Sequence, residues 1–305
     1  MCCLFGIYNY SGKKIKDITK LTNSLAREAT VRGLDATGIA YNQKGNLLIH
    51  KEAKSAYGIT FKHPEDVKAI MGHTRHATQG SEKYNYNNHP FPGRCKNTKF
   101  ALAHNGILSN DKLLKRTLKL PKTKIETDSY VAVQLLESQK KLNEEGLKYM
   151  AEKVDGSFSF TVLTEDNTLW FVKGDSPLSI VHFPEKQVYA YASTDEILYK
   201  GLIGTDFFKE IKDGKFEEIG ISAGQILKIT PDGALIFSSF DYVDDYFYGC
   251  DWWYCGKSHS RHFDDGYLDD LKCVAKNNGY TDDTIDDLVD KGFTMEEIEE
   301  FIYSY

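Results

Sequence analysis

The chain has 305 residues, of which 41% are hydrophobic and 13% aromatic, a composition typical of a globular protein with one large domain and room for a small one. Its net charge of -6 gives no electrostatic reason to expect nucleic acid or an anionic membrane as a partner. No apolar run reaches the ~18 residues of a membrane span, and the N-terminus is apolar before it is basic, the reverse of a secretory signal.

Cysteine usage indicates the cellular compartment. The six cysteines are too few and too scattered for a disulfide scaffold in a chain of this length. A cysteine at position 2 has no leader ahead of it, which argues against a lipoprotein anchor. We therefore expect a reduced, cytoplasmic protein.

The first 60 residues predict a strand, a helix and a hairpin. CLFGIYNY (3–10) is strand-like, and residues 17–31 carry apolar side chains at helical spacing before Arg32-Gly33 ends the helix. GIAYN (38–42) and NLLIHKEA (46–53) flank a Lys44-Gly45 turn, which predicts a hairpin.

The middle of the chain predicts two helices and then a series of strands. Residues 128–142 have the pattern of an amphipathic helix, and a second helix is expected through Met150. Apolar, β-branched and aromatic runs follow, at 157–164, 168–174, 178–183, 187–193 and 225–230, separated by turn residues. Because helices and strands come in clusters, we expect an α+β layered fold rather than a parallel α/β sheet.

The composition changes near residue 240, so we divide the chain into a domain at 2–240 and two further parts. Residues 241–264 are aromatic, acidic and irregular, and residues 265–305 predict three short helices as a small helical appendage. The appendage holds a repeat, GYTDDTIDDLV (279–289) and GFTMEEIEEFI (292–302), in which threonine is placed to cap each helix. We favour a solvated appendage over a specific docking module.

Two groups of residues could bind metal. Cys250, Cys255, His259 and His262 run as C-x4-C-x3-H-x2-H, a donor set that suits structural zinc, although the spacing is not that of a standard finger and the segment could simply be a loop. His73, His89 and His104 are interpreted instead as hydrogen-bonded framework residues.

Cys2 is the candidate nucleophile. Removal of Met1 would leave a thiol and a free α-amine on one residue, and an α-amine with a pKa of ~7.7–8.0 can accept the thiol proton at neutral pH. A cysteine at position 2 is weak evidence by itself, since most cysteines are buried, passive thiols.

Four segments supply the partners that such a nucleophile needs. GHTRHATQG (72–80) contains Arg75, whose fork suits a substrate carboxylate, and the hydroxyl of Thr78. HNG (104–106) offers the Asn105 amide and the Gly106 backbone N–H as an oxyanion hole. ETDS (126–129) places Asp128 where it could hold a substrate ammonium. RGLDATG (32–38) supplies Arg32 and Asp35 beside a tight backbone approach.

At these residues the sequence resembles the class II (N-terminal-nucleophile) glutamine amidotransferase domain, most closely the glutaminase domain of glucosamine-6-phosphate synthase. CCLFG, VRGLDATGIA, GHTRHATQG, NNHPF, AHNGILSN and IETDS keep that family's order and spacing, and the resemblance extends over about residues 2–230. It implies a four-layer αββα sandwich.

The resemblance also implies roles for single residues. Cys2 would be the nucleophile and its amine the base, Arg75 and Asp128 would clamp the glutamine carboxylate and ammonium with help from Thr78, and no cofactor would be needed. Asn105 and Gly106 would form the oxyanion hole, while Arg32 would support the N-terminal turn. Departures from the family pattern occur at Cys3, where the family has glycine, and at His76 and Gln79 beside the clamp.

The sequence therefore predicts a glutaminase that releases ammonia from L-glutamine through a Cys2 thioester. Since no recognisable synthase domain follows residue 240, we expect the ammonia to reach a separate synthase subunit in trans, with the C-terminal helices as a candidate dock. The alternative is an N-terminal-nucleophile amidase that acts on a different amide, such as a γ-glutamyl or acyl-amino compound. A non-catalytic module that kept the fold is the third hypothesis.

Overall fold

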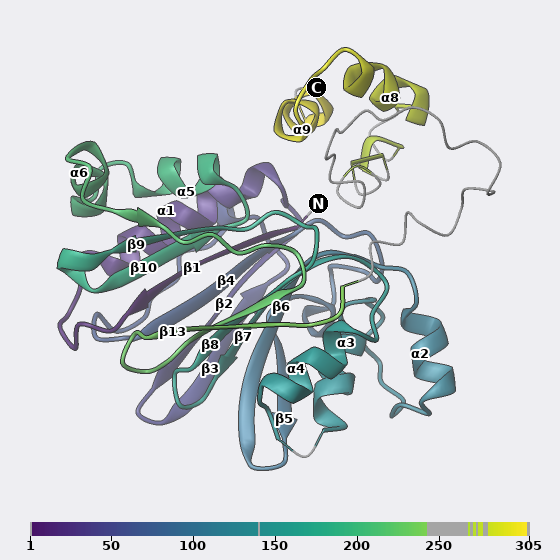
Figure 1. Ribbon diagram of the computed structural model, residues 1–305, viewed down its shortest axis with the longest axis horizontal. Coiled ribbons are helices and arrows are strands. Elements are labelled where there is room, and N and C mark those ends of the chain that lie inside the picture. The colour runs from purple at the N-terminus through teal and green to yellow at the C-terminus, as the bar shows by residue number, and fades with distance from the viewer. Residues whose placement is uncertain are drawn as a thin grey trace.

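The computed structural model describes residues 2–139, 141–242, 268, 271–272, 274–276 and 280–303. Two antiparallel sheets stack face to face, and helices cover the outer face of each sheet (Figure 1). The predicted α+β sandwich with four αββα layers is confirmed.

The first sheet has seven strands in the order β11-β9-β10-β1-β4-β2-β3, so that the N-terminal strand β1 lies in its middle. The strands are β1 (Cys3–Asn9), β2 (Ala36–Gln43), β3 (Asn46–Glu52), β4 (Ala69–Arg75), β9 (Ser179–Phe183), β10 (Val188–Ala192) and β11 (Glu217–Glu218). The predicted hairpin is β2–β3, and Lys44 and Gly45 turn it with φ values of 50° and 75°, the left-handed backbone of a tight hairpin turn.

The second sheet has six strands in the order β13-β12-β8-β7-β6-β5. They are β5 (Phe91–Cys95), β6 (Thr98–Leu108), β7 (Gly156–Thr164), β8 (Leu169–Lys173), β12 (Gln225–Ile229) and β13 (Leu235–Ser239). Each apolar run predicted as a strand between residues 157 and 230 forms one.

Helices α1 (Ile18–Glu28), α5 (Asp195–Leu202) and α6 (Asp206–Lys212) cover the first sheet, and α2 (Asp111–Thr117), α3 (Tyr130–Glu137) and α4 (Glu144–Ala151) cover the second. Short 3-10 turns lie at Ala29–Val31, Ala56–Gly58, Asn85–Asn87 and Pro184–Lys186. Three apolar cores result, one between the sheets and one under each helical layer.

The helix predicted over 128–142 differs from the structure in length and in character. α3 ends at Glu137, because the polar residues beyond it have no apolar surface to bury. It is not amphipathic either, since all six residues from Val131 to Leu136 are buried. β5 and α4 both pack on this helix, which explains why apolar side chains surround it.

The C-terminal residues form a small helical unit that we call the tail unit, the described residues of 268–303. Its bounded helices are α8 (Asp282–Asp290) and α9 (Met295–Tyr303), and residues 271–272 and 274–276 are helical as well. The unit has its own apolar core, separate from the three cores of the sandwich, made of Leu271, Val274, Ala275, Ile285, Met295, Ile298 and Ile302. The predicted irregular segment 241–264 lies outside the described residues, apart from 241–242.

The two copies of the repeat cap their helices differently. At α9 threonine caps the helix as predicted and forms a capping box, in which Thr294 N–H donates to Glu297 Oε2 at 2.9 Å and Glu297 N–H donates to Thr294 Oγ1 at 3.3 Å. At α8 the prediction is wrong in detail, because the Thr281 hydroxyl makes no cap bond and lies 3.0 Å from the Thr284 hydroxyl.

This difference predicts unequal effects of the same substitution. Thr294→Ala should weaken α9 by about 1 kcal/mol, since it removes a real N-cap bond, whereas Thr281→Ala should cost less than about 0.5 kcal/mol at α8. Amide hydrogen exchange of the two helices measures both local opening free energies. Equal losses of protection in the two variants would contradict the capping difference.

Candidate active site

Cys2 lies directly before β1, at the end of the sheet where the antiparallel neighbour β4 finishes. Its Sγ is partly buried and 3.6 Å from the carbonyl oxygen of His76, the residue after β4. Burial raises the pKa of the Cys2 thiol above its ordinary value, and the charge of Arg75 acts in the opposite direction. The thiol is therefore mainly protonated at neutral pH, so that attack on a substrate requires a base.

Cys3 points away from this edge. Successive side chains of a strand face opposite sides of the sheet, and Cys3 packs with Phe5 and Ile7 in the core under the helices. It is fully buried, and burial raises the pKa of its thiol to about 11. Cys3 thus fills the space that glycine leaves open in the family pattern, and its thiol belongs to the helix-side core.

Arg75 is the last residue of β4 and is buried. Its guanidinium donates to Asn88 Oδ1 at 2.8 Å and to the carbonyl oxygens of Gln79 and Gly80 at 2.7 and 2.8 Å. These bonds use both N–H donors of Nη2 and one of Nη1, so that Nε–H and one Nη1–H remain of the five donors of an arginine. The loop after β4 therefore fixes the orientation of the guanidinium. Thr78 lies in the same loop with an exposed side chain.

Asp35 and His76 form the wall beside Arg75. Asp35 Oδ2 accepts the N–H of Ala77 at 2.7 Å and lies 3.7 Å from His76 Nδ1. Gln79 donates from its side chain to the Glu126 carbonyl oxygen at 2.9 Å. His76 and Gln79, the two residues beside Arg75 that depart from the family pattern, thus both contact other residues of the chain.

Asn105 and Gly106 lie near the end of β6, which packs across from β1 and β4. Asn105 is fully buried, its Oδ1 has no hydrogen-bond partner among the described residues, and its Nδ2 makes one long contact of 3.5 Å to the Pro177 carbonyl oxygen. A buried amide with so few partners costs free energy, and this arrangement is typical of a group that waits for a ligand.

Gly106 has φ of 132°, a backbone conformation open to glycine alone. A Cβ at this position would lie 2.1 Å from the Ser157 carbonyl oxygen, because β6 and β7 approach closely there. The absent side chain leaves the strand end accessible.

Asp128 lies two residues before α3 and is only 5% exposed. Its Oδ2 accepts the backbone N–H of Leu108 at 2.7 Å, and the Ser129 hydroxyl lies 3.4 Å from Oδ1. Its charge raises the pKa of the Cys2 thiol and the charge of Arg75 lowers it, so both groups lie within electrostatic range of the thiol.

Arg32 is almost completely buried and binds the residue that carries the thiol. Its Nε donates to the Cys2 carbonyl oxygen at 3.0 Å, which is the contact that the predicted supporting role requires. Its Nη1 donates to Glu299 Oε2 at 2.6 Å, a partner from the tail unit that the sequence did not indicate.

Two further residues were missed by the sequence analysis. Asn88 orients the Arg75 guanidinium, and the partly buried Lys51 donates to the carbonyl oxygens of Asn88 and Pro90. Burial lowers the pKa of Lys51 to about 8. Asn88 belongs to the NNHPF motif, so its membership of a family motif could have indicated a role in the site. Lys51 lies in the hairpin strand β3, outside every motif, and nothing in the sequence indicated its role.

The three histidines pack beneath the site. His73 Nε2 lies 2.9 Å from the His104 carbonyl oxygen, His104 Nδ1 lies 2.9 Å from the Ser129 hydroxyl, and the His73 and His89 rings are 4.1 Å apart. Burial lowers the pKa of His73 to about 3 and the pKa values of His89 and His104 below the ordinary value. All three are therefore neutral framework side chains at neutral pH.

The zinc candidate Cys250, Cys255, His259 and His262 lies outside the described residues. Within the part of the chain that the structure describes, no group of three or more histidine, cysteine, aspartate or glutamate residues could hold a metal ion.

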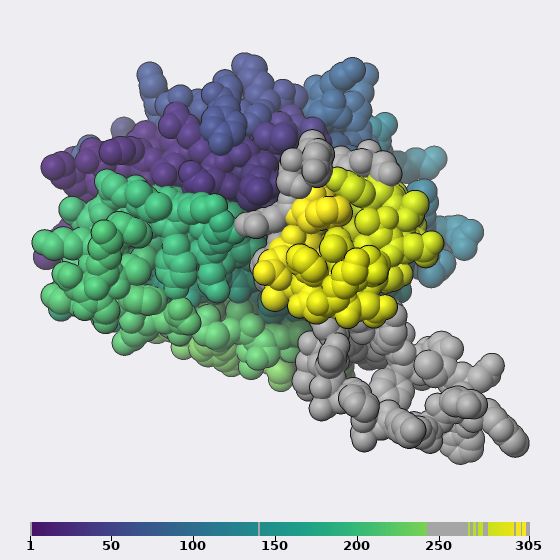
Figure 2. All heavy atoms as spheres, turned by 90° about the horizontal axis from the view of Figure 1, so that it is seen from above, coloured from purple at the N-terminus to yellow at the C-terminus, as the bar shows by residue number. Residues whose placement is uncertain are grey.

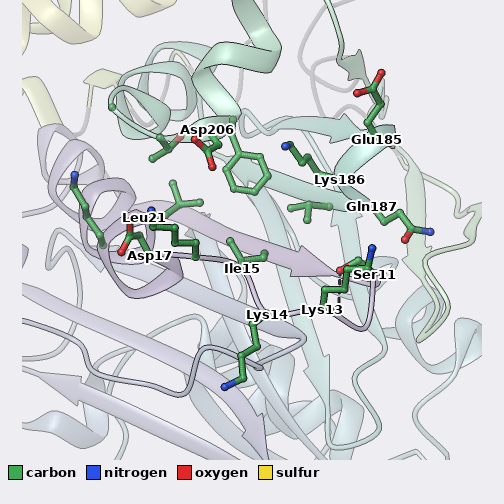
Figure 3. Close-up of a pocket in the computed structure, with 16 residues that line it drawn as sticks. Ser11, Lys13, Lys14, Ile15, Asp17, Leu21, Glu185, Lys186, Gln187 and Asp206 are labelled. Atoms are coloured by element: carbon green, nitrogen blue, oxygen red, sulfur yellow. Dashed lines mark hydrogen bonds between the residues drawn. The ribbon is translucent and has the colours of Figure 1, made fainter.

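A cavity of about 390 Å³ opens at the other end of β1 and contains none of the candidate residues (Figure 3). Lysines and acids share its wall, among them Lys13, Lys14, Asp17, Glu185 and Asp206. It is separate from the Cys2 region by the length of the strand.

Gly106→Ala should destabilise the protein by about 3 kcal/mol, because the added Cβ meets a backbone oxygen in a strained conformation. Gly220→Ala is the matched control, since nothing lies within 4 Å of its Cβ position, and it should change stability by less than about 0.5 kcal/mol. Urea unfolding measures both values, and an unchanged midpoint for Gly106→Ala would contradict the close approach.

The buried histidines predict acid sensitivity. Their folded-state pKa values lie below 6.5, so the unfolded chain binds more protons, and their contribution to stability is present above pH 6.5 and is lost as the pH falls. Each contributes a slope of up to about 1.4 kcal/mol per pH unit. Urea unfolding between pH 7.5 and 5 measures the slope, and exposed His50 offers a control, since His50→Gln should preserve it. A flat profile would show that these histidines are not buried as neutral groups.

Residues 73–200 match a family model described as a glutamine amidotransferase domain. The glutamine–fructose-6-phosphate aminotransferase (isomerizing) of Aquifex aeolicus is 31% identical over 246 residues, which is 76% of this chain and 37% of that protein. The Listeria innocua enzyme of the same name is 34% identical over 156 residues, 49% of this chain and 26% of that protein. The chain thus spans about a third of the length of these relatives.

Among solved structures, glutamine phosphoribosylpyrophosphate amidotransferase of B. subtilis superimposes with a TM-score of 0.61 at 23% identity, over 79% of this chain and 49% of that one. A structure of the allosteric regulatory enzyme of purine biosynthesis gives the same TM-score at 22% identity and the same coverage. At this identity the likeness establishes the fold. In the described part of the chain, no helix has the length and apolar character to cross a membrane.

Proposed function

This chain contains a class II glutamine amidotransferase domain of the N-terminal-nucleophile type, and on that premise we propose that it hydrolyses L-glutamine through a thioester on Cys2. The observation that carries the proposal is the setting of the Cys2 thiol, which lies within electrostatic range of Arg75 and Asp128, while Arg32 binds the Cys2 carbonyl oxygen. A nucleophile with a cationic and an anionic group in its surroundings suits an amide substrate that is also an amino acid.

The nucleophilic step requires a base, because burial keeps the Cys2 thiol protonated. Removal of Met1 exposes the α-amine of Cys2, whose pKa of ~7.7–8.0 lets it accept the thiol proton at neutral pH. Sγ then bonds to the carboxamide carbon of glutamine, and the amide nitrogen takes up a proton and leaves as ammonia. Water hydrolyses the thioester to glutamate and restores the thiol.

The developing oxyanion needs donors that are already in place. We assign this role to the Asn105 Nδ2 amide and the Gly106 N–H, supported by the single long contact of 3.5 Å that Nδ2 makes to the Pro177 carbonyl oxygen and by the glycine conformation at the strand end. The substrate carboxylate would bind a remaining donor of Arg75, with Thr78 in the same loop, and the substrate ammonium would pair with Asp128. This chemistry uses groups of the chain alone and needs no cofactor.

The acceptor of the ammonia is a second proposal. The aminotransferases that this chain resembles are roughly twice as long, and the match covers 37% and 26% of their length, so their full reaction does not extend to this chain by similarity. We propose delivery to a separate synthase subunit, with the tail unit as the dock. Binding of a candidate synthase that is unchanged by deletion of residues 241–305 would contradict this assignment.

Cys2→Ala should reduce glutamate production from glutamine by at least about 10³-fold, because the thioester can no longer form. Cys3→Ala is the control, since this thiol faces the helix-side core, and it should retain activity within about threefold. An enzymatic glutamate assay measures both, and intact mass establishes whether Met1 has been removed.

Glutaminase activity that survives Cys2→Ala would overturn the assignment of the nucleophile. Failure of the wild-type protein to turn over glutamine, with turnover of another γ-glutamyl or acyl-amino amide, would support the alternative amidase.

A further inference from the structure

The tail unit contacts the sandwich at the residue that holds the candidate nucleophile. Arg32 Nη1 and Glu299 Oε2 are 2.6 Å apart although 267 residues separate them in the sequence. The two side chains are 1% and 7% exposed, so the ion pair is buried between the two parts of the protein. Figures 1 and 2 show the tail unit beside the N-terminal end of β1 and next to α5.

Arg32 uses two different donors for two partners. Nε binds the Cys2 carbonyl oxygen at 3.0 Å, while Nη1 binds Glu299. Because a guanidinium is planar and rigid, the direction of one hydrogen bond constrains the direction of the other. Glu299 therefore helps to set the plane from which Arg32 holds Cys2.

The electrostatic need for Glu299 follows from the burial of Arg32. A buried cation without a partner is costly, and removal of one member of a buried ion pair is more damaging than removal of a surface charge. Arg32 and Glu299 line a small cavity of about 90 Å³. Three other charged residues line it as well, namely Glu28, Glu196 and Lys200. Glu196 and Lys200 form an ion pair with each other along α5, whereas Glu299 bonds directly to Arg32.

Glu299 lies on α9, the last helix of the tail unit. Ile298 and Ile302 on α9 point into its own core, and Glu299 lies at the edge of that apolar stripe. Among the described residues, this core is separate from the apolar cores of the sandwich. The ion pair between Glu299 and Arg32 thus forms only when the tail unit lies against the sandwich.

We propose that docking of the tail unit completes the glutaminase site, and that Glu299 is a positioning residue that acts on Cys2 through Arg32. The inference rests on the proposed hydrolysis of glutamine at Cys2 and adds to it a regulatory contact from the C-terminal end of the described chain. When the tail unit is docked, Arg32 is neutralised and oriented, and the Cys2 backbone is fixed for attack. When it leaves, the thiol keeps its chemistry but loses its orientation.

The test compares Glu299→Gln with wild type in the full-length protein. Glutamine keeps the shape and the acceptor oxygen but removes the charge, so kcat for glutamine hydrolysis should fall between about 10- and 100-fold while KM stays within about twofold. Glu299→Asp, which restores the charge, should recover part of kcat. Asp290→Asn is the matched control, since it removes one exposed acid from α8 and should leave kcat unchanged.

A double-mutant cycle with Arg32→Lys identifies the route of the effect. If Glu299 acts through Arg32, the losses in kcat should be strongly non-additive, and the second substitution should add little to the first. Fully additive losses, or wild-type kcat in Glu299→Gln with the tail helices still folded by circular dichroism, would overturn the proposal.

The alkylation rate of the Cys2 thiol by iodoacetamide separates this inference from the proposed function, because it requires no turnover of glutamine. Glu299→Gln should change that rate by at least about threefold relative to wild type and to Asp290→Asn, even if the natural substrate is a different amide. An unchanged alkylation rate would refute the positioning role, whereas a changed rate without glutaminase activity in wild type would refute only the proposed substrate.

Discussion

The antiparallel pairing of β1 with β4 is the constraint on which the rest of the site depends. It brings two strand ends to one edge of the sheet, so that the residue before β1 lies beside the residue that follows β4. The same pairing brings two different groups to this end of the sheet, the thiol of Cys2 before β1 and the guanidinium of Arg75 at the end of β4. Helices and loops then need only to orient these two groups, because the sheet has already placed them.

Orientation is achieved by using backbone carbonyls as acceptors. Arg75 is held by the carbonyls of Gln79 and Gly80, and Arg32 grips the carbonyl of Cys2 itself. Such bonds do not depend on which side chain occupies the acceptor position, which explains how His76 and Gln79 can replace the usual family residues. The departures from the family pattern change the local side chains while the backbone frame of the site is retained.

The candidate site carries features that reduce stability. Asn105 is buried with little hydrogen bonding, and Gly106 occupies a conformation that other residues avoid. Near them, three neutral histidines form a packed layer in which His73 and His104 are hydrogen-bonded, while neither ring nitrogen of His89 has a partner among the described residues. A large sandwich with three apolar cores supplies enough burial to offset these costs, which a small domain could not do.

The sequence by itself determined the elements and the candidates. Periodicity of two and of 3.6 residues placed β1–β3, β7–β10, β12 and helices α1, α3, α4, α8 and α9, since apolar spacing is a local property. It did not place β5, β6, β11, β13 or helices α2, α5 and α6. The order of motifs identified Cys2, Arg75, Asn105 and Asp128 as candidates. Only the tertiary structure decided that Cys3 faces the helix-side core, that Asn88 orients Arg75, and that Glu299 reaches Arg32. Even the repeated Thr281 and Thr294, alike in sequence, cap differently. These contacts join residues whose separation along the chain carries no information about their distance in space, and the direction of a single side chain depends on what packs against it.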